Sequence, residues 1–110
     1  MNKEIKKLWL EALRSGEYKQ GQGQLHNIKE GTFCCLGVLC DIIDKNNIYK
    51  PKRMILYTDF ESFDFLLGYL SNPMQKITGL DAQTAGNLLE MNDDQNKSFT
   101  EIADYIERAL

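Results

Sequence analysis

Apolar side chains recur one helical turn apart near the start of the chain. They form a single stripe made of Ile5, Leu8, Trp9, Ala12 and Leu13. The Ser15-Gly16 pair that follows is typical of a helix stop, because glycine readily takes the backbone conformation that ends a helix. The pattern therefore predicts an amphipathic helix over about residues 3–15.

A second apolar run, residues 32–44, has no broad polar face. A helical wheel places apolar side chains on nearly every side, which is typical of a helix at the centre of a small domain with neighbours on most sides. We expect Thr32 to cap this helix and Asn46-Asn47 to end it. The run contains all three cysteines of the chain: Cys34, Cys35 and Cys40.

Two helix starts follow in the last third of the chain. Ser71-Asn72-Pro73 is typical of a first helical turn, and Gly79 ends that short helix. Asp81 opens the next helix, which carries an unusually small face that lets another helix approach closely. The small face consists of Ala82, Ala85, Gly86 and Leu89.

The last helix begins after a polar turn at residues 92–97. Ser98 and Glu101 have the spacing of a capping box, in which each side chain bonds the other residue's backbone N–H. The apolar stripe that follows consists of Phe99, Ile102, Ala103, Ile106 and Leu110. We expect the two C-terminal helices to form an antiparallel pair.

Two stretches lack a clear helical stripe. Residues 17–28 mix polar and apolar positions with two glycines, which favours a short irregular strand or hairpin. Residues 54–57 fit a short strand, but residues 54–70 also fit helical spacing, and the pattern leaves both open. The predicted fold is mainly α (α+β), a single compact domain over residues 1–110, with four or five helices, a cysteine-rich central helix and a small β element.

Charge is unevenly distributed along the 110 residues, whose net charge is −3. Residues 1–30 hold six Lys/Arg against four Asp/Glu, and residues 31–110 hold seven against twelve. An acidic body disfavours broad binding to a phosphate backbone, so we expect no nucleic-acid partner, although the basic first third suits one small anion. We also expect no membrane span and no export signal, because no apolar stretch reaches 18 residues.

The cysteines favour structure over chemistry. Because Cys35 and Cys40 follow Cys34 by one and six positions and no His or fourth Cys stands at ligand spacing, they cannot form a zinc site, and we expect neither metal nor cofactor. Reduced, buried thiols indicate a reducing cytosol. The alternative is a nucleophilic Cys34 or Cys35 at the N-terminus of its helix, with His26 as the base; it stays open but is disfavoured. The chain is therefore expected not to be an enzyme.

Hydrogen-bond donors and one aromatic ring cluster around flexible glycines at residues 14–24. This composition suits a grip on a small anionic or nucleotide-like ligand, and its alternative is a polar surface turn. Asp41 is the only charge of the cysteine run before its last residue, Asp44, so it is expected to pair with Arg14 or Lys19, or to lie at the solvent edge of its helix. The candidate ligand-binding residues are Arg14, Tyr18, Lys19, Gln20, Gln22 and Asp41.

Several segments together resemble a family of small phage and prophage proteins. The likeness is carried by Trp9–Gln20, with its Arg-Ser-Gly-Glu-Tyr-Lys-Gln motif, by the Phe-Cys-Cys-Leu-Gly-Val-Leu-Cys-Asp motif at residues 33–41, and by Ser98–Glu107. The resemblance implies a phage origin and the cytoplasm of a host cell. It implies no activity, but it favours an accessory role, because small non-structural phage proteins commonly antagonise host defences.

These observations predict a phage accessory protein, with counter-defence as its role, that binds and sequesters a small anionic or nucleotide-type host molecule. The alternative is a protein–protein inhibitor of a host enzyme, whose acidic and aromatic surface is supplied by Asp59, Phe60, Glu61, Phe63, Asp64 and Phe65. Leu10, which lies off the first stripe, and the Gly37-Val38 edge of the central helix favour a homo-oligomer.

Overall fold

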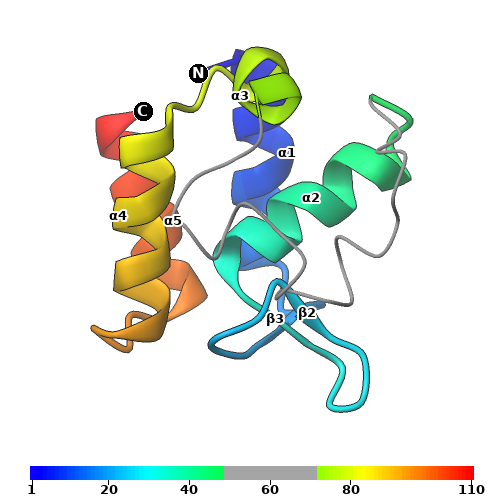
Figure 1. The fold of residues 1–110 in the computed structure, drawn as a ribbon, viewed down its shortest axis with the longest axis vertical. Coiled ribbons are helices and arrows are strands. Elements are labelled where there is room, and N and C mark those ends of the chain that lie inside the picture. Colours follow the sequence, from blue (N-terminus) through cyan, green and yellow to red (C-terminus); the bar gives the residue numbers. More distant parts are fainter. Residues whose placement is uncertain (49–71) are drawn as a thin grey trace.

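The computed structural model describes residues 1–48 and 72–110 of the chain. This part contains five helices that pack on one another and a very small sheet that lies at one end of the molecule (Figure 1). The helices are α1 (Lys3–Arg14), α2 (Cys35–Lys45), α3 (Asn72–Thr78), α4 (Ala82–Asp93) and α5 (Phe99–Ala109). The strands are β1 (Lys19–Gln20), β2 (His26–Asn27) and β3 (Thr32–Phe33). The predicted fold class, mainly α with a small β element, is confirmed; the strand or helix expected within 54–70 lies outside the described residues.

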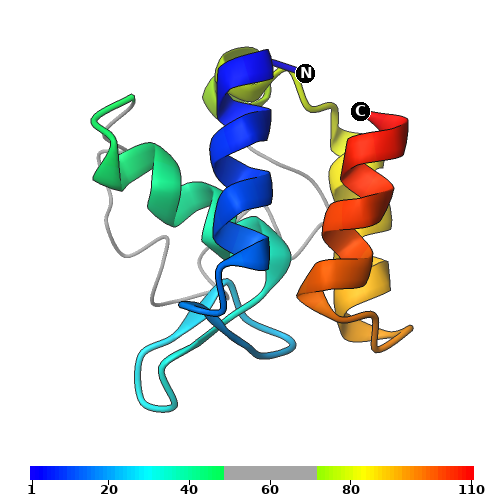
Figure 2. The ribbon, with the colours of Figure 1, turned by 180° about the vertical axis from the view of Figure 1, so that it is seen from behind.

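Helix α1 buries the stripe that the sequence predicts. Ile5, Trp9 and Leu13 are buried, and α1 packs against both α2 and α5 (Figure 2). The N-terminus is capped by Asn2, whose side chain accepts a hydrogen bond from the Ile5 N–H at 3.0 Å. The fully buried Trp9 donates its indole N–H to the Cys35 carbonyl at 3.0 Å, which ties α1 to the start of α2 without leaving a buried donor unpaired.

Helix α2 is the centre of the core, as its apolar pattern predicts. Every residue from 35 to 40 is buried, and only Asp41, Asp44 and Lys45 in the helix keep access to solvent. The expected cap is wrong: Cys34 is the N-cap, and its Sγ accepts the Gly37 N–H at 3.4 Å. Thr32 is unavailable for capping because it belongs to β3 and pairs with residues of both other strands.

The sheet has the order β1-β3-β2, with β3 parallel to β1 and antiparallel to β2. It confirms a β element at residues 17–28 and adds a strand that the sequence places in a helix. The loop before β2 passes directly over α2. A Cβ at Gly37 would stand 1.8 Å from the Leu25 carbonyl oxygen, so only glycine permits this approach.

The C-terminal helices follow the predicted boundaries closely. Asp81 caps α4, the capping box of Ser98 and Glu101 is present, and α4 and α5 run antiparallel side by side (Figure 1). Ala85, from the small face, is fully buried where α4 packs against α2. The polar turn is shorter than expected, because α4 continues to Asp93.

Candidate functional site

Arg14 forms ion pairs with two residues of α5. Its Nη2 lies 2.8 Å from Asp104 Oδ1 and 2.8 Å from Glu107 Oε1, and these hydrogen bonds, led by that to Glu107, raise the pKa of the guanidinium. The expected pairing of Arg14 with Asp41 is therefore wrong. The reason is tertiary: Arg14 is the last residue of α1, and α5 packs beside that helix.

Asp41 is held by Tyr18, whose hydroxyl donates to Asp41 Oδ2. Burial first, and then this bond to a carboxylate, raises the pKa of the Tyr18 hydroxyl well above its usual value. The Tyr18 ring also meets Phe33 edge to face, with ring centroids 5.0 Å apart. Lys19, the other expected partner of Asp41, is exposed.

Gln20 is bonded to residues more than 70 positions further along the chain. Its Nε2 donates to Asn92 Oδ1 at 2.9 Å and to the Lys97 carbonyl at 2.8 Å, and its Oε1 accepts the Phe99 N–H at 3.1 Å. This uses both N–H groups and the oxygen of the amide. Gln20 therefore joins β1 to the turn between α4 and α5.

Asn92, which accepts one of the Gln20 hydrogen bonds, is fully buried. Its Nδ2 donates to the Gly21 carbonyl at 2.9 Å and to Asp93 Oδ1 at 2.8 Å, and its Oδ1 also accepts the Cys35 N–H at 3.2 Å. Beside it, Gln22 Nε2 donates to Asn96 Oδ1 at 2.8 Å, and the Gly23 N–H donates to Asp93 Oδ1 at 3.1 Å. We call residues 20–23, bonded to residues 92–99, the clasp.

The clasp gives the polar composition of this segment a folding explanation. Gly21 lies so close to Thr32 that a Cβ would stand 2.4 Å from Thr32 Oγ1, and Gly23 has a φ of +79°. The candidate residues are also divided in space: Arg14 lines one hollow and Tyr18 a different hollow of about 280 Å³ beside α2. A ligand-binding role for them stays a prediction.

The three cysteines are buried and form no disulfide, as predicted. Burial raises the pKa of the Cys34 thiol to about 12 and raises the pKa values of Cys35 and Cys40 as well. Cys35 Sγ donates to the Leu88 carbonyl at 3.5 Å, whereas the His26 ring stacks on Phe33 with centroids 4.0 Å apart. The geometry therefore disfavours a thiolate nucleophile activated by His26.

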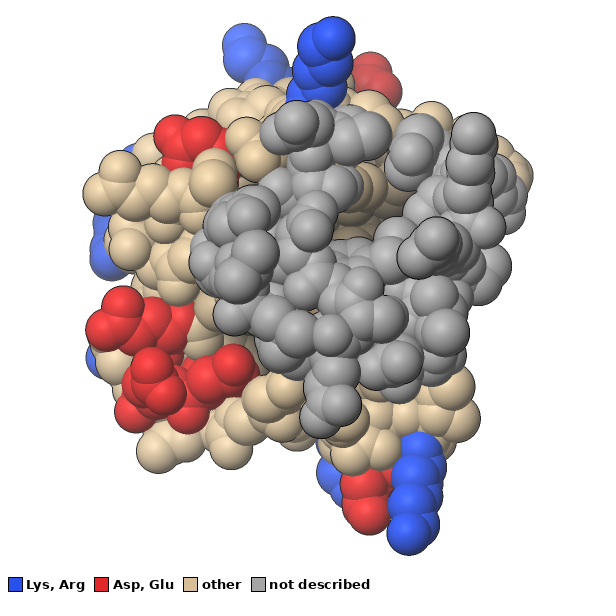
Figure 3. All heavy atoms as spheres, viewed as in Figure 1, with Lys and Arg blue, Asp and Glu red and all other residues tan. Residues whose placement is uncertain are grey.

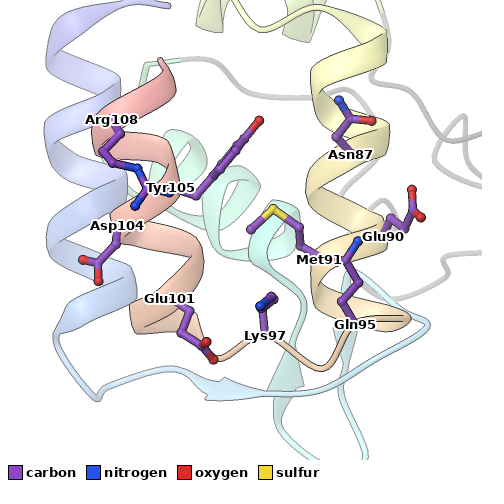
Figure 4. Close-up of a pocket in the computed structure, with 9 residues that line it drawn as sticks. All are labelled: Asn87, Glu90, Met91, Gln95, Lys97, Glu101, Asp104, Tyr105 and Arg108. Atoms are coloured by element: carbon purple, nitrogen blue, oxygen red, sulfur yellow. The ribbon is translucent and has the colours of Figure 1, made fainter.

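A cleft of about 540 Å³ opens between α4 and α5 (Figure 4). We call it the α4–α5 cleft. It is lined by Asn87, Glu90, Met91, Gln95, Lys97, Glu101, Asp104, Tyr105 and Arg108. Tyr105 and Met91, both half-buried, point toward each other from the two helices and provide an apolar floor.

The charges of the α4–α5 cleft differ in their partners. Glu101 accepts the Ser98 N–H at 3.0 Å, which lowers the pKa of its carboxyl, and Asp104 pairs with Arg14. Glu90 projects from the side of α4 that faces away from α5 (Figure 4). The Lys97 charge also contributes to lowering the pKa of Glu101. In residues 1–48 and 72–110, neither the Lys97 ammonium nor the Arg108 guanidinium makes a side-chain hydrogen bond or a close ion pair. Two cations are thus available in a cleft whose nearest carboxylates are occupied.

A second hollow of about 480 Å³ lies along α1 and is mostly apolar at its floor because of Leu10 and the lysine stems. It is lined by Lys3, Lys6, Lys7, Leu10, Glu11, Arg14 and Glu107. We call Lys3, Lys6, Lys7, Leu10 and Arg14 the basic face of α1. This hollow matches the weakly basic first third of the sequence.

The chain belongs to a family described only as a domain of unknown function, DUF8296, whose model matches residues 1–84. The match includes the basic face of α1 and the first half of the clasp, and it ends before the residues that line the α4–α5 cleft. No curated protein and no solved structure matches the chain.

The sequence analysis missed Lys97, Tyr105 and Arg108 as candidate site residues. Tyr105 and Arg108 are three positions apart and off the apolar stripe of their helix, which was the available signal. Their meeting with Met91 depends on how α4 packs beside α5, and the pattern of one helix does not contain that information. The acidic and aromatic surface expected at residues 59–65 lies outside the described residues.

Proposed function

We propose that the protein is a phage accessory protein that binds and sequesters a small anionic, nucleotide-type host molecule in the α4–α5 cleft. The single observation that carries the proposal is the pairing of an apolar, aromatic floor with two cations, Lys97 and Arg108, whose side chains make no hydrogen bond or close ion pair in the described part of the chain. The phage origin, the counter-defence role and the cytoplasm of the host cell come from the sequence resemblance and belong to the proposal.

The lining fits the chemistry of such a ligand. The Tyr105 ring offers a face on which a base can stack, and the Met91 thioether packs against flat rings. Arg108 supplies the planar, multiply donating group that suits phosphate, and Lys97 adds a second point charge. The side-chain amides of Asn87 and Gln95 are donors and acceptors that can read the edge of a base.

The availability of side-chain groups favours the α4–α5 cleft over the surface at residues 14–24 as the binding site. There, Gln20 and Gln22 bond within the clasp, and Tyr18 bonds Asp41. A ligand on that surface would first have to replace these bonds. A ligand in the α4–α5 cleft meets the Lys97 and Arg108 side chains, which make no hydrogen bond or close ion pair in the described part of the chain. Occupied groups contribute little net binding free energy, because each new bond costs an old one.

The first test is to identify what the protein retains. Protein purified from bacterial lysate under native conditions is denatured, and the released small molecules are analysed by mass spectrometry. The purified chain is then titrated by calorimetry with mononucleotides and cyclic dinucleotides. We expect Arg108→Ala and Tyr105→Ala each to weaken binding at least about tenfold, which corresponds to about 1.4 kcal/mol.

Two matched variants control for charge and ring loss. Tyr105→Phe keeps the ring and should hold affinity within about threefold, and Lys29→Ala removes an exposed cation from the turn after β2 and should change nothing. Absence of any released nucleotide together with no binding tighter than about 1 mM would contradict the proposal. Equal losses for Lys29→Ala and Arg108→Ala would show charge attraction without a site.

A further inference from the structure

The two cations of the α4–α5 cleft stand toward opposite ends of it. Arg108 lies near the end of α5, nine residues after Phe99, the first residue of the helix, and nine residues of α-helix rise about 14 Å along the axis. Lys97 lies in the turn before α5, at the other end of the cleft (Figure 4). Tyr105 precedes Arg108 by one helical turn, and Met91 points toward it from α4, so the apolar floor separates the two cations.

Each end of the α4–α5 cleft also holds one side-chain amide. Asn87 projects from α4 at the end where Arg108 lies, and Gln95 lies in the turn with Lys97 (Figure 4). An amide N–H donates to a phosphate oxygen as readily as to any other oxygen acceptor. The two ends therefore offer the same pair of groups, one cation and one amide, on either side of an apolar floor.

The position of the floor decides how a nucleotide can use both cations. A single phosphate bonded by Lys97 and Arg108 together would lie over the floor, because the floor lies between them. It would then cover the Tyr105 ring, on which a base can stack. A base on this ring is compatible with both cations only if each cation binds a phosphate of its own.

Carboxylates beside the cations favour separated charges in the ligand. Asp104 lies one turn before Arg108 on α5. Glu101 lies at the same end of the cleft as Lys97 (Figure 4). Acidic side chains also gather at the end of α4 that leads into the turn, and the last turn of this helix holds no basic residue (Figure 3). A second phosphate without a cation of its own would meet these carboxylates, so two adjacent phosphates at one cation are disfavoured.

We infer that the α4–α5 cleft selects nucleotides whose two phosphate groups are separated, with the base on the floor between its two ends. One phosphate binds Arg108 and Asn87, and the other binds Lys97 and Gln95. The inference rests on the proposed function and narrows its ligand class. Nucleoside 3′,5′-bisphosphates have this chemistry, because their phosphates stand at two positions of the ribose, whereas the two phosphates of a nucleoside 5′-diphosphate are adjacent.

Calorimetric titration of the full chain with three adenosine nucleotides tests this selectivity. AMP carries one phosphate, ADP carries two adjacent phosphates, and adenosine 3′,5′-bisphosphate carries two separated ones. We expect the bisphosphate to bind at least about tenfold more tightly than AMP or ADP, because only its phosphates reach both cations. Equal affinity for ADP and the bisphosphate would overturn the inference in favour of total charge, and equal affinity for AMP would show that one phosphate is enough.

Lys97→Met separates the inference from the proposed function. The variant removes the charge but keeps the alkyl stem and the backbone carbonyl that accepts a hydrogen bond from Gln20. It should weaken the bisphosphate at least about tenfold and AMP by less than about threefold, because a lone phosphate prefers the planar guanidinium of Arg108. Retained AMP binding also shows that the variant is folded. Arg108→Ala should weaken both nucleotides.

The outcomes distinguish the two proposals. If Lys97→Met leaves the bisphosphate unaffected while Arg108→Ala and Tyr105→Ala weaken AMP, the inference is refuted and the proposed function stands. No binding of any of the three nucleotides would overturn both. Lys29→Met makes the same change at an exposed lysine in the turn after β2 and should leave all three affinities unchanged. A loss equal to that of Lys97→Met would overturn the inference in favour of general charge attraction.

Discussion

The clasp and the α4–α5 cleft carry the same kinds of side chain but differ in what those side chains bond. In the clasp, the amides of Gln20 and Asn92 make three and four hydrogen bonds. In the cleft, the side-chain cations of Lys97 and Arg108 make no hydrogen bond or close ion pair within the described residues. The polar groups of the clasp therefore stabilise the fold, whereas the cleft contains polar side chains that are available to a ligand. Donor-rich composition alone does not distinguish the two, whereas an account of the bonds does.

The largest effect is expected outside both regions, where the loop before β2 passes over α2 at Gly37. Gly37→Ala places a methyl group 1.8 Å from the Leu25 carbonyl oxygen, a backbone atom that also accepts the Cys34 N–H. The backbone of residues 25–26 must move, and we expect a loss of more than about 3 kcal/mol in the free energy of unfolding. Urea unfolding followed by circular dichroism measures it.

A matched control for this variant is Gly31→Ala, which meets no atom within 4 Å but has a φ of +69°. It should cost about 1 kcal/mol from backbone strain alone. If Gly37→Ala were no more destabilising than Gly31→Ala, the close approach of the Leu25 carbonyl to α2 would be wrong.

Asn92→Ala removes the centre of the clasp and should have the second largest effect. It leaves the Cys35 N–H, the Gly21 carbonyl and the Gln20 amide without their buried partner. At about 1 kcal/mol or more for each group, we expect a loss of about 3 kcal/mol in the free energy of unfolding. The exposed Asn87, on the same helix but in the cleft, is the matched control, and Asn87→Ala should change stability by less than about 0.5 kcal/mol.

This pair of variants tests directly whether the clasp and the cleft differ in their contribution to stability. The clasp is a folding element only if Asn92→Ala destabilises far more than Asn87→Ala. Similar, small losses for both would mean that the clasp bonds contribute little. Gln20 and Gln22 would then be as free to bind a ligand as the cleft residues.

The sequence contains enough to predict the helices but not these contacts. The stripe around Trp9 and the capping box of Ser98 and Glu101 depend on residues within one or two turns, so local patterns find them. The local pattern predicts Thr32 as a helix cap, but Thr32 pairs with Lys19 and Asn27 in the sheet, and a local pattern does not contain those contacts. Gln20 bonds residues more than 70 positions away, and no local pattern contains that separation.

The candidate site follows the same rule. Residue types at 14–24 suggested binding because donors and an aromatic ring cluster in sequence, yet tertiary partners occupy most of them. Tyr105 and Arg108 form part of a cleft only because α4 lies beside α5. Local sequence therefore predicts which side chains are polar, and the packing of distant segments decides which of them are available.

Tyr18→Phe tests the hydrogen bond between Tyr18 and Asp41 through the pH dependence of stability. The folded-state pKa of Tyr18 is raised, so its contribution to stability is complete below the unfolded pKa of about 10 and is lost as pH rises above it. Removing the hydroxyl leaves Asp41 without this donor and should cost about 1 kcal/mol at pH 7. Urea unfolding between pH 7 and about 11 should show the difference between parent and variant shrinking as pH rises. A constant difference would contradict a neutral Tyr18 bonded to Asp41.

Arg14→Ala should have the smallest effect on stability and the sharpest consequence for the site. Its two ion pairs are solvent-exposed, with carboxylate side chains 58% and 59% exposed, so their loss should cost less than about 1 kcal/mol and shift the thermal midpoint by a few degrees at most. The variant also frees Asp104 beside the cleft, where an unpaired carboxylate should weaken an anionic ligand moderately, less than Arg108→Ala does. If Arg14→Ala instead abolishes binding while Tyr105→Ala leaves it intact, the ligand lies on the surface at residues 14–24. Calorimetric titration of the two variants side by side therefore decides between the two regions.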